Sequence, residues 1–183
     1  MSKLLDVLFA DENKAALKEV QNNFDLSEKE TRIAVEELIP ALSRGLQKNT
    51  QDAPGMDDLL EALRTGEHAR YMEQPDLLGK STTTKDGNDI LGHIFKEKKV
   101  SREVAGRVAK QSGISATVLK KMLPVVASLV MGALSKQVIG GGGSRSRAGQ
   151  AGSGGLIASL LDGDKDGSIW DDVLGMAART MLR

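Results

Sequence analysis

The most apolar stretch of the chain, Met122 to Leu134, constrains the fold more strongly than any other feature of the sequence. Its 13 residues include Pro124 and Ser128, whereas a helix that spans a membrane needs roughly 20 mostly apolar residues. We therefore predict a buried core helix here and no membrane span. At 183 residues the chain is long enough for one substantial domain plus an appendage.

A second long helix is predicted from Ser27 to Lys48. Ser27 is a good N-cap because its hydroxyl can accept a hydrogen bond from an amide of the first turn, and Glu30 completes a capping box. Its apolar residues recur at roughly helical spacing, and they are Ile33, Val35, Leu38, Ile39, Leu42 and Leu46. Shorter helices are predicted at 2–9, 13–23, 56–64 and 68–72. These patterns together predict an all-α fold.

The sequence also repeats itself at offsets of 86 and 88 residues. The matched segments are Leu4-Leu5 and Leu8-Phe9 with Ile90-Leu91 and Ile94-Phe95, and Leu26-Ser27 with Ile114-Ser115. We interpret this as a duplicated three-helix unit, with chance similarity as the alternative. The predicted core spans residues 1–138, and it comprises repeat 1 at 2–49, a connector at 50–85 and repeat 2 at 86–138.

Composition shifts after the core. Residues 139–155 are rich in glycine and serine, which predicts a flexible linker. Residues 156–183 predict a helical tail, with helices at Leu156 to Leu161 and Ser168 to Leu182 around an acidic loop. The tail helices are amphipathic and need an apolar partner, so we expect the tail to dock on the core or on a second subunit.

The acidic loop carries the sharpest chemical signal of the sequence. Its alternating aspartates and glycine resemble the start of an EF-hand loop, in which Ca²⁺ takes several oxygen ligands from a tight turn. The twelfth position, normally a bidentate glutamate, is Val173. We predict a weak Ca²⁺ site with six candidate ligands, which are Asp162, Asp164, Asp166, Ser168 (through its backbone carbonyl), Asp171 and Asp172. The alternative is a solvated acidic loop that favours the positive end of the next helix.

Residues 108–121 resemble the corner of a helix-turn-helix. Gly113 would lie in the turn, Ile114 and Leu119 would be apolar anchors, and Lys120 and Lys121 follow. A DNA-binding regulator is therefore the alternative function. The zero net charge, the 3% aromatic content and the apolar continuation of the second helix all disfavour nucleic-acid binding.

The sequence suggests no reaction. It contains no serine elbow and no phosphate-binding glycine loop, and the absence of cysteine excludes thiolate chemistry and disulfides. We expect His68 and His93 to be buried, hydrogen-bonded residues or helix caps, and we predict that the protein is not an enzyme. A concave pocket with convergent polar groups around either histidine would argue for one. The N-terminus is unlike a secretory signal, so we expect a cytoplasmic protein.

Four segments in order resemble a bacterial family catalogued as domain of unknown function 937, which has YidB-like proteins as distant relatives. They are Leu38 to Leu46, Asp86 to Phe95, Leu119 to Pro124 and Met131 to Lys136. The resemblance implies a helical fold and a bacterial source, and it brings no established activity. From the amphipathic tail and the missing catalytic motifs we predict a non-enzymatic interaction or assembly protein that binds a protein partner or self-associates as a homo-oligomer, with Ca²⁺ as the candidate ion for ordering the tail.

Overall fold

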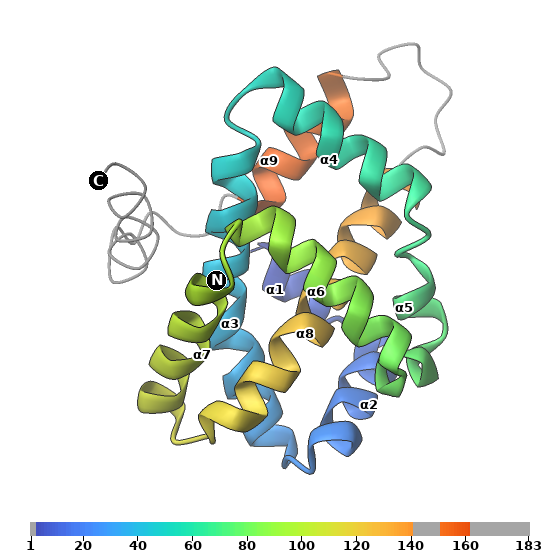
Figure 1. Ribbon diagram of the computed structural model, residues 1–183. Coiled ribbons are helices and arrows are strands. Elements are labelled where there is room, and N and C mark those ends of the chain that lie inside the picture. Colours follow the sequence, from blue (N-terminus) through green and yellow to red (C-terminus); the bar gives the residue numbers. More distant parts are fainter. Residues whose placement is uncertain (1–2, 141–150, 162–183) are drawn as a thin grey trace, which may run out of the picture.

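The computed structural model describes residues 3–140 and 151–161 and consists of helices packed around one central helix, α8 (Figure 1). No β-strand occurs in these two ranges. The central helix spans Ala116–Gly140, and all the other α-helices contact it. Every residue from 122 to 135 is buried. The predicted core helix is therefore confirmed, as is the all-α fold.

Length and composition alone would also make α8 a candidate membrane span. The candidate window lies within Ala116–Ile139, and 78% of it is buried inside the protein. A helix that is apolar all round is expected either in a membrane or at the centre of a larger core. Here the surrounding helices, and not lipid, cover the apolar surface of α8, and this burial explains its apolar composition.

The first three helices follow the sequence prediction closely. Helix α1 spans Lys3–Leu8, the short 3-10 helix η1 spans Asp11–Asn13, α2 spans Lys14–Phe24 and α3 spans Glu28–Asn49. The capping box at the start of α3 is formed, since the Glu30 amide donates to Ser27 Oγ at 3.2 Å and the Ser27 amide donates to Glu30 Oε2 at 2.9 Å. The predicted local signal therefore defines where α3 begins.

The connector and the second half supply the remaining helices around α8. Helix α4 spans Ala53–Thr65, α5 spans Arg70–Glu73, the 3-10 helix η2 spans Pro75–Gly79, α6 spans Ser81–Phe95 and α7 spans Lys98–Ser112. Helix α6 crosses α8 so closely that Gly87 packs on the backbone of Pro124. The order of α6, α7 and α8 parallels that of α1, α2 and α3, but α6 has 15 residues and α1 has six. The duplication stays a prediction.

The linker predicted at 139–155 is too long at both ends. Helix α8 continues through Gly140, and α9 spans Ala151–Leu161. Helix α9 lies against α1, α3, α4 and α8, with Ile157, Leu160 and Leu161 buried. The first tail helix therefore belongs to the core of its own chain. The second predicted tail helix lies outside the described residues.

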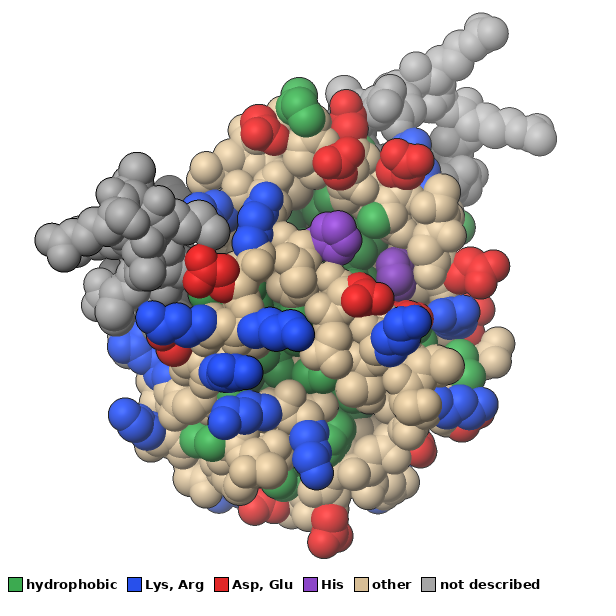
Figure 2. All heavy atoms as spheres, in the orientation of Figure 1, with side chains coloured by type: hydrophobic (Ala, Val, Ile, Leu, Met, Phe, Trp, Pro, Cys, Tyr) green, Lys and Arg blue, Asp and Glu red, His purple; other side chains and the backbone are tan. Residues whose placement is uncertain are grey.

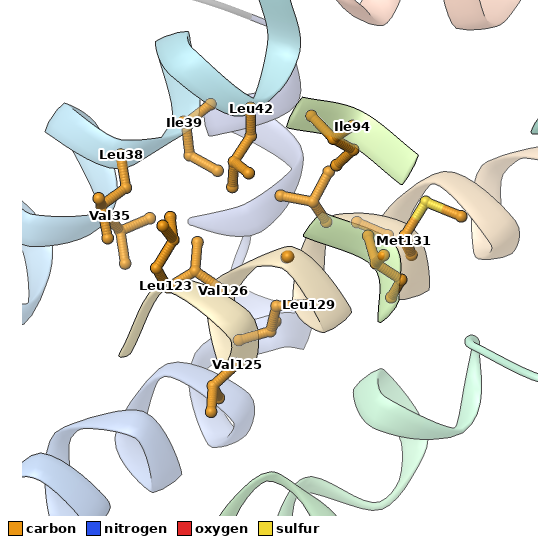
Figure 3. Close-up of a cluster of buried hydrophobic side chains, with 14 of the residues drawn as sticks. Val35, Leu38, Ile39, Leu42, Ile94, Leu123, Val125, Val126, Leu129 and Met131 are labelled. Atoms are coloured by element: carbon orange, nitrogen blue, oxygen red, sulfur yellow. The ribbon is translucent and has the colours of Figure 1, made fainter. Parts of the chain in front are cut away.

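The core joins α3, α6 and α8. In Figure 3, side chains of α3 point toward α8, and Ile94 of α6 lies beside them. The labelled residues of this cluster are Val35, Leu38, Ile39, Leu42, Ile94, Leu123, Val125, Val126, Leu129 and Met131. Because these residues come from three long helices, the core holds the ends of α3 and α6 in fixed positions.

Candidate functional site

A cleft of about 570 Å³ opens between α4, α6 and the C-terminal end of α3. Both histidines of the chain line it, and Figure 2 shows them close together on one face, with acidic side chains around them and hydrophobic atoms visible between them. The volume lies within the range of small-ligand sites, roughly 300 to 1,000 Å³. The cleft is therefore large enough to hold a small molecule or a few side chains of a partner.

The floor of the cleft is apolar. It is formed by buried side chains from four helices, which are Leu46 of α3, Leu59 of α4, Ile90 and Ile94 of α6, and Met131 of α8. All five belong to the buried hydrophobic core of the protein, so the floor of the cleft is the outer surface of that core. An apolar surface at the bottom of a cleft gains free energy when a ligand excludes water from it.

One asparagine fixes the end of α3 against the end of α6. Asn49, at the end of α3, donates from Nδ2 to the carbonyl oxygens of His93 and Ile94 at 2.9 and 3.0 Å. On the other side, Gly55 of α4 lies so close to α3 that a Cβ would come within 1.8 Å of the Asn49 carbonyl oxygen. The shape of the cleft is therefore set by backbone packing and hydrogen bonds between helices.

The rim of the cleft carries three carboxylates in different environments. Asp86 is half-buried and accepts hydrogen bonds from the Tyr71 hydroxyl and from Arg70 Nη2, the latter at 2.9 Å. Asp58 and Asp89 are exposed, and among the described residues neither has an ion-pair partner. Lys96 contributes one positive charge to the lining. The charge of Asp86 is compensated locally, whereas Asp58 and Asp89 face the opening uncompensated.

His68 is the less exposed of the two histidines. Its Nδ1 is buried and has no hydrogen-bond partner among the described residues, and its ring lies 6.3 Å from that of Tyr71. Burial lowers the pKa of His68 because charging the ring there is costly; the Asp86 charge acts in the opposite direction and Arg70 in the same direction. The prediction of a hydrogen-bonded histidine is thus wrong for His68 Nδ1. His93 is exposed in the last turn of α6, so the first alternative, burial, is wrong for it, and the second, a helix cap, stays a prediction.

This environment predicts how stability depends on pH. Because the pKa of His68 is lower in the folded state, its contribution is fully present above the unfolded-state pKa of about 6.5 and is lost as pH falls below that value. We expect His68→Gln to lose less unfolding free energy between pH 7 and pH 5 than the wild-type protein does, in denaturant titrations at each pH. The matched control is the same comparison between pH 7 and pH 8.5, where the variant and the wild-type protein should change equally; equal loss of both proteins between pH 7 and pH 5 would contradict the assignment.

The predicted Ca²⁺ ligands lie outside the described residues. Asp162, Asp164, Asp166, Ser168, Asp171 and Asp172 all follow the last described residue, Leu161. Within residues 3–140 and 151–161, no group of three or more His, Asp or Glu side chains could hold a metal ion. The Ca²⁺ site therefore stays a prediction from the sequence.

The helix-turn-helix corner is formed by α7 and α8. Gly113 ends α7 in the left-handed conformation with a φ of 75°, and Ile114 and Leu119 are buried as predicted. Lys120 and Lys121 are exposed near the start of α8, whereas the helix is buried from Met122 to Ser135. Only the exposed residues of 116–121 in α8 could therefore reach a groove of DNA, which a recognition helix enters with its N-terminal residues.

The comparisons with known proteins identify a family without an assigned activity. A family model described as "Bacterial protein of unknown function (DUF937)" matches residues 6–137. No curated protein and no solved structure matches the chain. The matched range runs from α1 to the last turns of α8 and includes all the residues that line the cleft. The chain therefore belongs to the bacterial DUF937 family.

Proposed function

We propose that this protein is a non-enzymatic helical interaction module and that the cleft is its recognition site. The cleft would take an apolar side chain next to a cationic group from a protein partner. One observation carries this proposal, which is that an apolar floor from four helices lies open between Asp58 and Asp89, two carboxylates without an ion-pair partner among the described residues. An apolar residue of the partner would cover the floor, and a neighbouring lysine or arginine would form ion pairs with Asp58 and Asp89.

The rigidity of the cleft supports this proposal. Its walls are helices fixed by Asn49 and by the close contact at Gly55, so a partner need not order them on binding. A preformed site loses less conformational entropy when it binds than a flexible one does. The apolar floor would supply most of the affinity and the carboxylates would supply selectivity for a cation.

A binding role fits the histidines better than a catalytic one. A general base needs an imidazole that a third group orients through a hydrogen bond, but His68 Nδ1 has no such partner among the described residues. His93 is exposed, and its helix places it at the rim. The pocket that could have argued for an enzyme is therefore better explained as a recognition surface.

The two histidines allow a direct test of this proposal. Because they are the only histidines of the chain and both line the cleft, their imidazole proton signals in NMR spectra report its occupancy. A short amphipathic peptide of leucine and lysine should shift both signals in a saturable way. A peptide in which glutamate replaces each lysine should shift them at much higher concentration, because the rim would repel it.

A pair of neighbouring aspartates supplies the control. Asp58 lines the cleft, whereas Asp57 is exposed on the same helix and does not. Asp58→Lys should weaken peptide binding about tenfold, since exposed ion pairs contribute up to about 1 kcal/mol and the variant adds repulsion. Asp57→Lys should leave the affinity nearly unchanged. Equal binding of both peptides, or no shift of either histidine signal, would overturn the proposed site.

The acidic loop is the second part of the proposed function. We propose that it binds Ca²⁺ weakly through the six predicted oxygen ligands and that this binding orders the tail for assembly. Calorimetric titration of the whole chain with Ca²⁺ should release or absorb heat, and Asp162→Ala/Asp164→Ala should abolish that signal. The solution mass should be recorded with and without Ca²⁺. No heat would leave a solvated acidic loop, and an unchanged mass would remove the link to assembly.

A further inference from the structure

Positive charge is concentrated on one part of the surface. Residues 96–121 contain eight basic and two acidic residues, a net charge of +6 within a chain whose total charge is zero. In Figure 2, Lys and Arg side chains gather where Figure 1 draws α7 and the start of α8. We define the basic face by its exposed members, which are Lys98, Lys99, Arg102, Lys110, Lys120 and Lys121.

Little within the described residues compensates this charge. Of the six members, only Lys99 forms an ion pair there, with Glu103 one turn further along α7 at 3.8 Å. Like charges crowded on adjacent turns repel one another, so the face is a strong attractor for an anion. The charge of the face is therefore available to an acidic segment that can reach it.

Such an acidic segment follows α9 directly. Residues 162–172 contain five aspartates and one lysine, a net charge of −4. Among the residues that follow the basic face in the sequence, this segment has the highest density of carboxylates, since residues 122–161 contain no acidic residue. The charges of the two segments are therefore complementary in sign and similar in size.

The structure fixes the point from which this segment starts. Leu161 is buried, and its carbonyl oxygen accepts a hydrogen bond of 2.9 Å from Gln47 Nε2 of α3. Helix α3 packs directly against α7, which carries most of the basic face. The chain beyond Leu161 therefore leaves the core from the helix next to α7.

The length of the segment is sufficient for contact. Eleven residues span up to about 36 Å when extended, whereas the 15 residues of α7 are about 22 Å long. A tether this short gives the segment an effective concentration in the millimolar range near the face. Several ion pairs between the segment and the face would then form at the same time, even if each one is weak.

We infer that the acidic segment of residues 162–172 docks on the basic face of its own chain and covers it. The contact is electrostatic, so it weakens with salt and requires the carboxylates. It is independent of the cleft, but it uses the same carboxylates as the proposed Ca²⁺ site, so bound Ca²⁺ should weaken it. It also places the tail beside the corner of α7 and α8, where it competes with any other polyanion for the same lysines and arginines.

A spin label in the segment tests this inference. The chain contains no cysteine, so Ser168→Cys in the full chain gives a single site for a nitroxide, and a chelator removes Ca²⁺. At low ionic strength the amide signals of exposed α7 residues should lose intensity through paramagnetic broadening. The signals of α2, which lies on the far side of the bundle from α7 (Figure 1), should keep theirs. Salt at about 1 M shortens the Debye length to about 3 Å, and the α7 signals should then recover.

The matched variant carries Asp→Asn at Asp164, Asp166, Asp171 and Asp172 in the labelled chain. It should show no α7 broadening at low salt, because the segment keeps its length but loses most of its negative charge. Three outcomes would overturn the inference. The first is broadening of the α7 signals that persists in this variant. The second is broadening that occurs only between labelled and unlabelled copies in a mixture. The third is α7 signals that are not broadened and that shift when an oligonucleotide is added, which would assign the face to nucleic acid.

Discussion

Replacing Gly87 with alanine should lower the free energy of unfolding by up to about 2 kcal/mol. A Cβ at this position would lie 2.0 Å from the carbonyl oxygen of Pro124 and 2.5 Å from its carbonyl carbon. Both atoms belong to the backbone of α8, so no side-chain rotation can relieve the clash and the two helices must separate. Overpacking of this kind costs about 1 to 3 kcal/mol or more, and the higher helix propensity of alanine, about 1 kcal/mol, offsets only part of it.

The same helix contains the matched control. Gly92 is exposed, and a Cβ there would meet no atom within 4 Å. Gly92→Ala should therefore raise the free energy of unfolding by about 0.5 to 1 kcal/mol through helix propensity alone. Denaturant unfolding followed by circular dichroism measures both changes. If Gly87→Ala also stabilised the protein, α6 and α8 would not cross as closely as the structure shows.

Local signals made much of the fold predictable from the sequence. Ser27 and Glu30 form the capping box that starts α3, and Gly113 ends α7 in a left-handed turn. The 13-residue apolar run lies within the fully buried part of α8. In each case the residues on which the prediction rests also form the cap, the turn or the buried face that defines the helix. A short stretch of sequence is then sufficient to define the element.

The start of α9 shows where local signals fail. Gly152, Gly154 and Gly155 favour a flexible chain, since glycine costs about 1 kcal/mol in a helix relative to alanine. The helix nevertheless begins at Ala151, and a Cβ at Gly154 would be in ordinary contact with Met56 of α4 at 3.6 Å. Tertiary contacts with distant segments outweigh propensity here. Those contacts cannot be read from the composition of residues 139–155.

The cleft was hidden from the sequence for the same reason. Its lining comes from residues 46–66, 68, 86–96 and 131, and no motif joins these segments. His68 and His93 are separate residues in ordinary helical patterns, and only the packing of α4 and α6 on α3 brings them together. The Tyr71 hydroxyl that donates to Asp86 is likewise a contact between α5 and α6. A shared position at the ends of three helices, and not spacing in the sequence, defines this site.

Shortening Ile157 to alanine should lower the free energy of unfolding by about 2 to 4 kcal/mol. Ile157 is fully buried where α9 meets the core, and truncation of a buried isoleucine removes apolar contacts and leaves a cavity. Leu156, its neighbour in the same helix, is 39% exposed. Leu156→Ala should therefore cost much less, below about 1 kcal/mol. Denaturant unfolding of both variants in the full chain gives the comparison.

The size of the difference decides whether α9 is part of the cooperative core. If α9 unfolds with the rest of the protein, Ile157→Ala shifts the whole transition and the two neighbours differ by at least about 1 kcal/mol. If the two variants have equal, small effects, α9 detaches before the core unfolds, since a locally unfolding segment reports only its own stability. In that case Leu161 would not be held at Gln47, and residues 162–172 would no longer start from a fixed point on α3. This substitution therefore tests the anchor on which docking of the acidic segment depends.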